Sequence, residues 1–107
     1  MPEYTLSIIT PQGKIFEEPV KSFIVPGEEG FFEILAGHAP ILALVTRGVV
    51  TITQASKRYM AIGAGVLEVN SQHHCLLLVD FASWAKSLAE AAERLQRDKS
   101  EIFLKSR

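Results

Sequence analysis

The sequence predicts a mainly β protein, an antiparallel β-sandwich or barrel followed by one α-helix. Between residues 4 and 79 the apolar residues come in short runs separated by turn residues, which is typical of such all-β folds. Several runs alternate apolar and polar residues, the period of a half-buried strand. The last quarter of the chain contains no Gly or Pro and is rich in Ala, Glu, Leu and Arg, which favours a helix. We therefore expect a sandwich domain over residues 1–82 and a helical segment over residues 83–107.

The length and composition allow one compact core. The chain has 107 residues, of which 48% are hydrophobic, and this suits a single domain. The turn signals that divide its β region are PQG (11–13), PGEEG (26–30), AGHAP (36–40), ASK (55–57), GAG (63–65) and NSQH (70–73).

Two segments show the alternation of a half-buried strand. In VVTIT (49–53), Val50 and Ile52 point to one face. In VLEVN (66–70), Leu67 and Val69 oppose Glu68. We expect the apolar face of each strand to lie in the core.

The segment CLLLV (75–79) is apolar at every position, so both faces of this strand need a cover. A second sheet covers one face of a sandwich strand. We expect the helix to close the other face of this strand through Leu88 and Leu95.

The segment FFEILAGHAP (31–40) begins as a strand and becomes a loop near Ala36. Gly37 frees the backbone, and Pro40 restricts the residue before it to extended conformations. By alternation, at least one of Phe31 and Phe32 lies in the core.

The predicted helix has Ser83 available as its cap and one apolar stripe. The stripe consists of Trp84, Leu88, Ala91, Leu95 and Ile102. Pairs spaced four residues apart elsewhere on the helix are Glu90 with Arg94, Glu93 with Arg97, and Glu101 with Lys105. Asp98 and Lys99 weaken the stripe, so we expect the helix to fray from about Lys99 onward.

Charge and cysteine content exclude several classes of partner. Eleven Lys and Arg against 12 Asp and Glu give a net charge of -1, which provides no field for nucleic acid or anionic lipid. The single cysteine, Cys75, cannot form an internal disulfide and lies in an apolar run, where we expect it to be inert. No basic leader and no apolar stretch of roughly 18 residues is present, so we expect a soluble protein inside the cell.

The sequence does not predict a catalytic, metal or cofactor site. Gly63-Ala64-Gly65 leads into another strand and so lacks the helix that a dinucleotide loop needs, and the turn at residues 27–30 carries two carboxylates that would repel phosphate. His73 and His74 have no nearby ligands at metal spacing and are expected in a solvated turn. From the residues alone, His38 is an ordinary hydrogen-bonding loop residue.

Five motifs between residue 4 and about residue 80 occur in the order of a known family. They are Thr10-Pro11-x-Gly13 before Phe16, Pro26-Gly27-x-x-Gly30 before Ile34-Leu35, Gly37-His38-Ala39-Pro40, Gly48 after a short apolar stretch, and Gly63-x-Gly65 before Leu67-Glu68-Val69. With these motifs the chain resembles the β-sandwich domain of the epsilon subunit of F-type ATP synthases, called delta in mitochondria.

The resemblance implies a flattened sandwich of about ten strands that couples proton or sodium flow to ATP synthesis without catalysing a reaction itself. It implies binding to the gamma subunit of the central stalk through Thr10, His38 and Ala39. It implies binding to the membrane rotor ring, the c-ring, through Glu28, Glu29, Gly30, Phe31, Pro40, Ile41 and Leu42. The helix would reach the alpha and beta catalytic subunits. The location would be the cytoplasmic face of the bacterial inner membrane, or the stromal side of the thylakoid, with attachment only through the complex.

The chain departs from the family pattern in two places. Glu33 stands where glycine is common, which puts the local backbone shape in question, and Phe31 stands where a polar residue can occur. Many members continue into a two-helix hairpin, and some bind ATP there through an Ile/Leu-Asp-x-x-Arg-Ala pattern. Here one helix ends the sequence and the pattern is missing, so we expect no ATP binding and weak or absent self-inhibition. The alternatives are a generic β-sandwich interaction module and, less favoured, a small sugar-binding or cupin-like enzyme.

Overall fold

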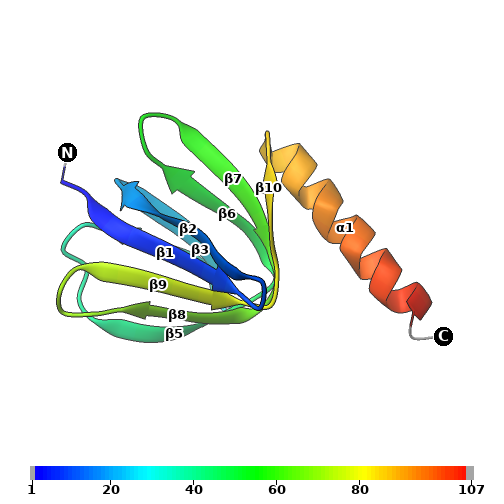
Figure 1. Ribbon diagram of the computed structural model, residues 1–107, viewed down its shortest axis with the longest axis horizontal. Helices are drawn as coiled ribbons and strands as arrows, with labels where there is room; N and C mark the ends of the chain where they lie inside the picture. The colour runs from blue at the N-terminus through cyan, green and yellow to red at the C-terminus, as the bar shows by residue number, and fades with distance from the viewer. Residues whose placement is uncertain (1, 106–107) are drawn as a thin grey trace.

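The computed structural model describes residues 2–105, with side chains described for residues 2–96. Two sheets pack face to face, and one helix follows them (Figure 1). The strands are β1 (Tyr4–Thr10), β2 (Gly13–Val20), β3 (Ser22–Gly27), β4 (Gly30–Leu35), β5 (Ile41–Val45), β6 (Gly48–Thr53), β7 (Lys57–Ile62), β8 (Gly65–Val69), β9 (His74–Val79) and β10 (Ala82–Ala85), and the helix is α1 (Leu88–Lys105). The predicted β-sandwich with a C-terminal helix is confirmed.

Each sheet has five strands. Sheet I has the order β2-β1-β9-β8-β5, and sheet II has the order β10-β7-β6-β3-β4. One pairing departs from the predicted antiparallel arrangement, because β1 and β9 run parallel. A parallel pair needs a long crossover between its strands. Here the crossover is formed by residues 11–73, which contain β2 to β8.

The core lies between the two sheets and is aliphatic with a few aromatic rings. The predicted inward positions Val50, Ile52 and Leu67 are fully buried, and Val69 is nearly so. Their two-residue period is what places them on one face of a strand. Other fully buried side chains are Leu6, Ile8, Val20, Phe23, Val25, Met60, Ile62, Cys75 and Leu77.

Strand β4 ends at Leu35, as the Gly37 and Pro40 signals predict. Phe32 packs against the core, whereas Phe31 stays 67% exposed, which agrees with the expected alternation. Glu33 is exposed and pairs with Ile24 in a regular antiparallel ladder. The Glu33 side chain is therefore accommodated in a regular strand.

The helix begins at Leu88 and not at Ser83. Its cap is Ser87, whose Oγ accepts a hydrogen bond from the Glu90 backbone N–H at 3.1 Å. Residues 82–85 form β10, which pairs with β7, so the sandwich extends beyond the boundary expected at residue 82.

Trp84 lies in β10 and not on the helical stripe. Its ring meets Phe16 edge-on, with centroids 5.6 Å apart, and the Arg58 guanidinium lies 4.0 Å above it. These contacts come from β2 and β7, and packing of this kind overrides the helix propensity of the surrounding residues.

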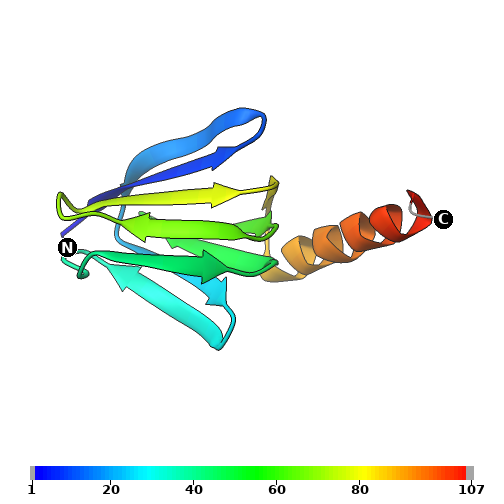
Figure 2. The same ribbon diagram turned by 90° about the horizontal axis from the view of Figure 1, so that it is seen from below.

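Helix α1 does not cover the second face of β9. It packs mainly on β7, β10 and β6, which belong to sheet II, and Figures 1 and 2 show its far end projecting beyond both sheets. Leu88 is 54% exposed, and Ala91 is the residue of its first turns that is fully buried. The prediction was wrong because the chain crosses from β9 into β10, at the edge of the other sheet, before the helix begins.

Two contacts of the helix are defined by described side chains. Arg47 donates a hydrogen bond to the Leu95 carbonyl, and Glu90 pairs with Arg94 at 2.8 Å, as its spacing predicts. The two pairs expected further along the helix, the stripe position at Ile102 and the fraying from Lys99 lie outside the residues whose side chains the structure describes.

We expect Tyr4→Phe to lower the free energy of unfolding by about 1–2 kcal/mol. The Tyr4 hydroxyl of β1 donates a buried hydrogen bond of 2.6 Å to the Ile34 carbonyl of β4, and so ties one sheet to the other. The substitution leaves that carbonyl without its donor. Urea denaturation measures the effect, with Tyr59→Phe as a control because Tyr59 is half-buried and makes no such hydrogen bond within the described region. Equal stability of the two variants would contradict the assignment.

Stability should also fall in alkaline solution. Burial raises the pKa of the Cys75 thiol to about 12, and burial, followed by the charges of Cys75 and Glu33, raises the pKa of the Tyr4 hydroxyl. In the unfolded chain these groups release their protons near pH 8.5 and pH 10, roughly, so the unfolded state binds fewer protons there and stability declines as pH rises. Urea midpoints at about pH 7 and about pH 10.5 should show this loss, and Tyr4→Phe should show a smaller one.

Candidate partner-binding surface

The histidines do not form a metal centre within the described residues, where no group of three potential ligands is found. His73 lies in the β8–β9 turn with a positive φ of 61°, as the solvated-turn prediction expects. His74 instead opens β9, is half-buried, and places its Nε2 3.1 Å from Ser7 Oγ. Its position in a paired strand was not predictable from the polar residues around it.

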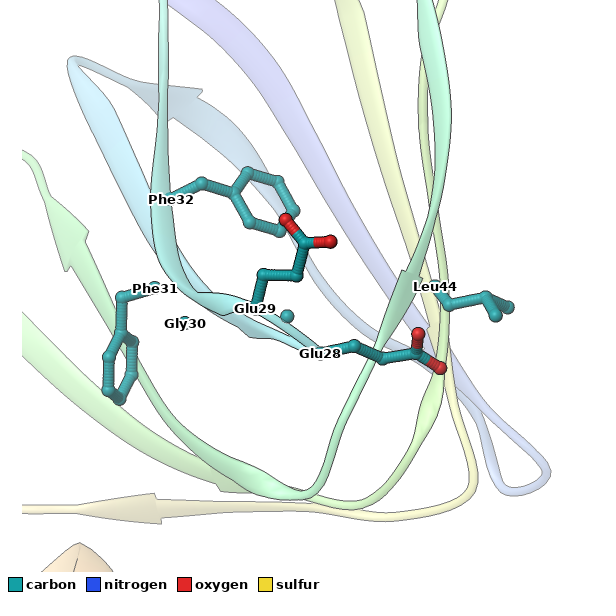
Figure 3. Close-up of a pocket in the computed structure, with 7 residues that line it drawn as sticks. Glu28, Glu29, Gly30, Phe31, Phe32 and Leu44 are labelled. Carbon is teal, nitrogen blue, oxygen red and sulfur yellow. The ribbon is translucent and has the colours of Figure 1, made fainter.

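The β3–β4 turn carries four of the predicted ring-binding residues. Gly30 adopts a φ of 122°, which favours glycine, and Glu28, Glu29 and Phe31 are all exposed. The turn lines a pocket of about 430 Å³ together with Phe32 and Leu44. Figure 3 shows Phe31 and Phe32 on opposite sides of β4, with the two carboxylates spread around the turn. This end of the sandwich therefore presents an exposed aromatic ring beside two negative charges.

The remaining ring-binding residues of the sequence prediction lie elsewhere. Strand β4 leads from its turn to the 36–40 loop, so Pro40, Ile41 and Leu42 follow its other end, which lies roughly 13 Å along the strand from Phe31. Pro40 is exposed, Ile41 packs against the core, and Leu42 is 74% exposed. The structure does not bring these two groups of residues together.

The predicted gamma-binding residues are also separated. Thr10 ends β1, and the 36–40 loop lies at the opposite end of the sandwich (Figures 1 and 2). Thr10 is buried, and its Oγ1 accepts from the Gln12 backbone N–H at 3.2 Å, which fixes the β1–β2 turn. His38 is half-buried with Nδ1 2.7 Å from the Ala39 carbonyl, and Ala39 is exposed.

An aliphatic stripe crosses the outer face of sheet I and was not predicted. Its members are Leu44 of β5, Val66 of β8, Leu78 of β9 and Ile9 of β1, which pair with one another in that order. Leu44 is 62% exposed and Leu78 is 43% exposed. Leu42 and Leu76 flank the stripe on the same face. The CLLLV segment, which is apolar on both faces of its strand, was the sequence signal for this surface. The sequence prediction instead had the helix covering the second face.

The aliphatic stripe has the properties of a docking surface. Four strands spaced about 4.8 Å apart make it roughly 14 Å long. Contiguous apolar surface of this kind on a folded domain marks an interaction site more often than single exposed residues do. Within the described residues, no helix is long and apolar enough to cross a membrane.

One known family matches most of this chain. The family described as ATP synthase, Delta/Epsilon chain, beta-sandwich domain matches residues 3–85. The chain belongs to this family. The match of the delta/epsilon domain ends at Ala85, where β10 ends, and so agrees with the sandwich boundary in the structure. The generic interaction module is not favoured.

Individual relatives within the delta/epsilon family support the assignment. The ATP synthase epsilon chain of Leptospira interrogans is 32% identical over 108 residues, covering 92% of this chain and 85% of the relative. The epsilon chain of Sulfurovum sp. is 35% identical over 105 residues, covering 89% and 81%.

Two solved structures share the delta/epsilon fold. A chain of the Euglena gracilis mitochondrial ATP synthase, in its OSCP/F1/c-ring structure, superposes with a TM-score of 0.74 at 20% identity. The match covers 94% of this chain and 66% of that one, slightly under two thirds of its length. A chain of the Tetrahymena thermophila central stalk and c-ring gives a TM-score of 0.68 at 13% identity, covering 98% and 96%. At these identities the likeness shows the fold.

Proposed function

We propose that this chain is a central-stalk epsilon subunit that couples ion flow through the membrane ring to ATP synthesis. It binds the gamma subunit through the aliphatic stripe of sheet I and carries out no chemistry itself. The observation that supports this most directly is an uncovered aliphatic stripe on a member of the delta/epsilon family. Two packed sheets form a stiff body, which suits a part that transmits torque.

The sequence-predicted gamma residues fit this surface at its two ends. Thr10 directly follows Ile9 of the stripe. His38 and Ala39 lie in the loop that precedes β5, which supplies Leu42 and Leu44. We assign Leu42 to the gamma surface and not to the ring, because it pairs with Glu68 on the face of the stripe. Pro40 then lies at the edge of the same surface, whereas Ile41, the residue before Leu42, packs against the core.

The β3–β4 turn is the part that we assign to the c-ring. This turn lies at the end of the sandwich opposite the 36–40 loop (Figure 2). It shares a pocket with Leu44 of the stripe, so the ring surface and the gamma surface that we propose adjoin each other there. The projecting end of α1 is available to the alpha and beta subunits. The assembly would hold the chain at the cytoplasmic face of the bacterial membrane.

Co-purification from native membranes tests this function. The tagged full chain should recover gamma, the c subunit and the catalytic alpha and beta subunits together, and untagged membranes provide the background. Recovery of the chain alone, or with proteins unrelated to a rotary ATPase, would refute the proposal.

A further inference from the structure

We propose that the gamma surface that covers the aliphatic stripe presents a basic side chain, an arginine or a lysine, to Glu68. This ion pair would fix the register in which the two surfaces dock. The inference rests on the proposed binding of gamma to sheet I, and it adds the chemistry that this partner must bring.

Glu68 lies where the apolar surface of sheet I meets a polar depression on the same face, between the two leucines that flank the stripe. Glu68 pairs with Leu42 of β5 on one side and with Leu76 of β9 on the other. Each of these three residues lies two positions along its strand from a member of the aliphatic stripe. Its own neighbours in β8, Leu67 and Val69, point into the core, so its side chain lies on the outer face and is exposed. A partner that covers the stripe together with Leu42 and Leu76 therefore also covers this carboxylate.

The described chain supplies no counter-charge for Glu68. No hydrogen bond or ion pair to its carboxylate is formed by any described side chain. Glu68 and Glu17 line one depression of about 300 Å³, together with Asn70 and His74. Two basic groups line that depression, and each has a partner other than Glu68. Lys14 Nζ lies 3.0 Å from Glu17 Oε2, and His74 Nε2 lies 3.1 Å from Ser7 Oγ.

The carboxylate of Glu17 already has a counter-charge and hydrogen-bond donors within the subunit. It accepts hydrogen bonds from Lys14 and, at 2.8 Å, from Ser7 Oγ, and these hydrogen bonds, that of Lys14 foremost, lower the pKa of its carboxyl. Glu68 is consequently the carboxylate of this depression that still depends on water. In the free subunit water can satisfy it, because the position is exposed.

Docking changes the environment of Glu68. A carboxylate that loses its water needs an opposite charge and hydrogen-bond donors, since an unpaired buried charge strongly opposes association. The depression beside Glu68 has room for a guanidinium or ammonium group. A guanidinium suits it best, because its N–H groups can bind both carboxylate oxygens at once.

The test measures the affinity of the full-length chain for the gamma subunit of the same ATP synthase, held in its complex with alpha and beta. Glu68→Gln should weaken binding about tenfold or more. Glu68→Leu should weaken it further, because the basic group of gamma then faces aliphatic carbon. Glu33→Gln removes an exposed strand carboxylate from sheet II and should leave the affinity unchanged.

Salt dependence provides an independent readout. Between about 50 mM and about 500 mM salt the wild-type affinity should fall, and the Glu68→Gln affinity should fall less. If Glu68→Leu binds as tightly as wild type or more tightly, or if both proteins respond equally to salt, the ion pair is refuted while docking on sheet I stands. If the wild-type chain does not bind gamma at all, the proposed function itself is wrong.

Discussion

Gly65→Ala should destabilise the sandwich by about 3 kcal/mol or more, the largest effect of any single-atom addition that we expect. A Cβ at this position would lie 1.8 Å from the carbonyl oxygen of Leu78 and 2.8 Å from the Cα of Val79. Both atoms belong to the backbone of β9, which is paired on its two sides and cannot move away without breaking a ladder. The free energy of unfolding in urea measures the loss.

Two substitutions at neighbouring positions serve as controls for Gly65→Ala. Ala64→Ser adds one atom at an exposed position and should change stability by less than about 0.5 kcal/mol. Gly63→Ala should cost less than Gly65→Ala, because its closest clash, at 1.6 Å, is with the side-chain Oδ1 of exposed Asp80, which can rotate. A Gly65→Ala protein as stable as Ala64→Ser would show that the close approach of β8 to β9 is not required. The close approach of β8 to β9 is the physical reason for glycine at position 65.

Replacing Leu44 and Leu78 together by glutamate should abolish gamma binding while leaving the fold intact. Both side chains are exposed in the stripe, so their loss should change the free energy of unfolding by less than about 1 kcal/mol. In the proposed complex gamma buries both leucines, and well-packed anchor residues of an interface contribute about 2 kcal/mol or more each. The affinity for the complex of gamma with alpha and beta should fall at least about 100-fold.

The matched control for this variant is Leu88→Glu. Leu88 is a similarly exposed leucine, but it lies in the first turn of α1 beside sheet II. Its replacement should leave gamma affinity unchanged. Wild-type affinity in the double variant, with its fold verified by circular dichroism, would place the gamma contact on another face.

The strand pattern of this protein was predictable wherever one face of a strand is buried. Val50 with Ile52 and Leu67 with Val69 occupy the predicted inward positions, because alternation is a property of neighbouring residues. The start of the helix was not predictable in the same way. Residues 83–87 have helical composition, but Trp84 gains a ring contact with Phe16 and a cation above its face only when β2 and β7 are already in place.

The candidate site likewise has one part that was predictable from the sequence and other parts that were not. The β3–β4 turn could be located from Gly27 and Gly30 because the turn is made of consecutive residues. The separation of that turn from Pro40 and Leu42 depends on the length of β4 and on where β5 joins sheet I. The aliphatic stripe takes one residue from each of four strands, so no window of the sequence contains it.

The sequence by itself therefore determined the strands, the turns, the single core and the family to which this chain belongs, since all of these follow from residues close in the chain or from motifs in a fixed order. Only the tertiary structure decided the parallel pairing of β1 with β9, the side of the sandwich on which α1 packs, and the apolar face left for a partner. The reason is physical: a surface is assembled by hydrogen-bonded register between distant strands, and that register is fixed by the whole core at once.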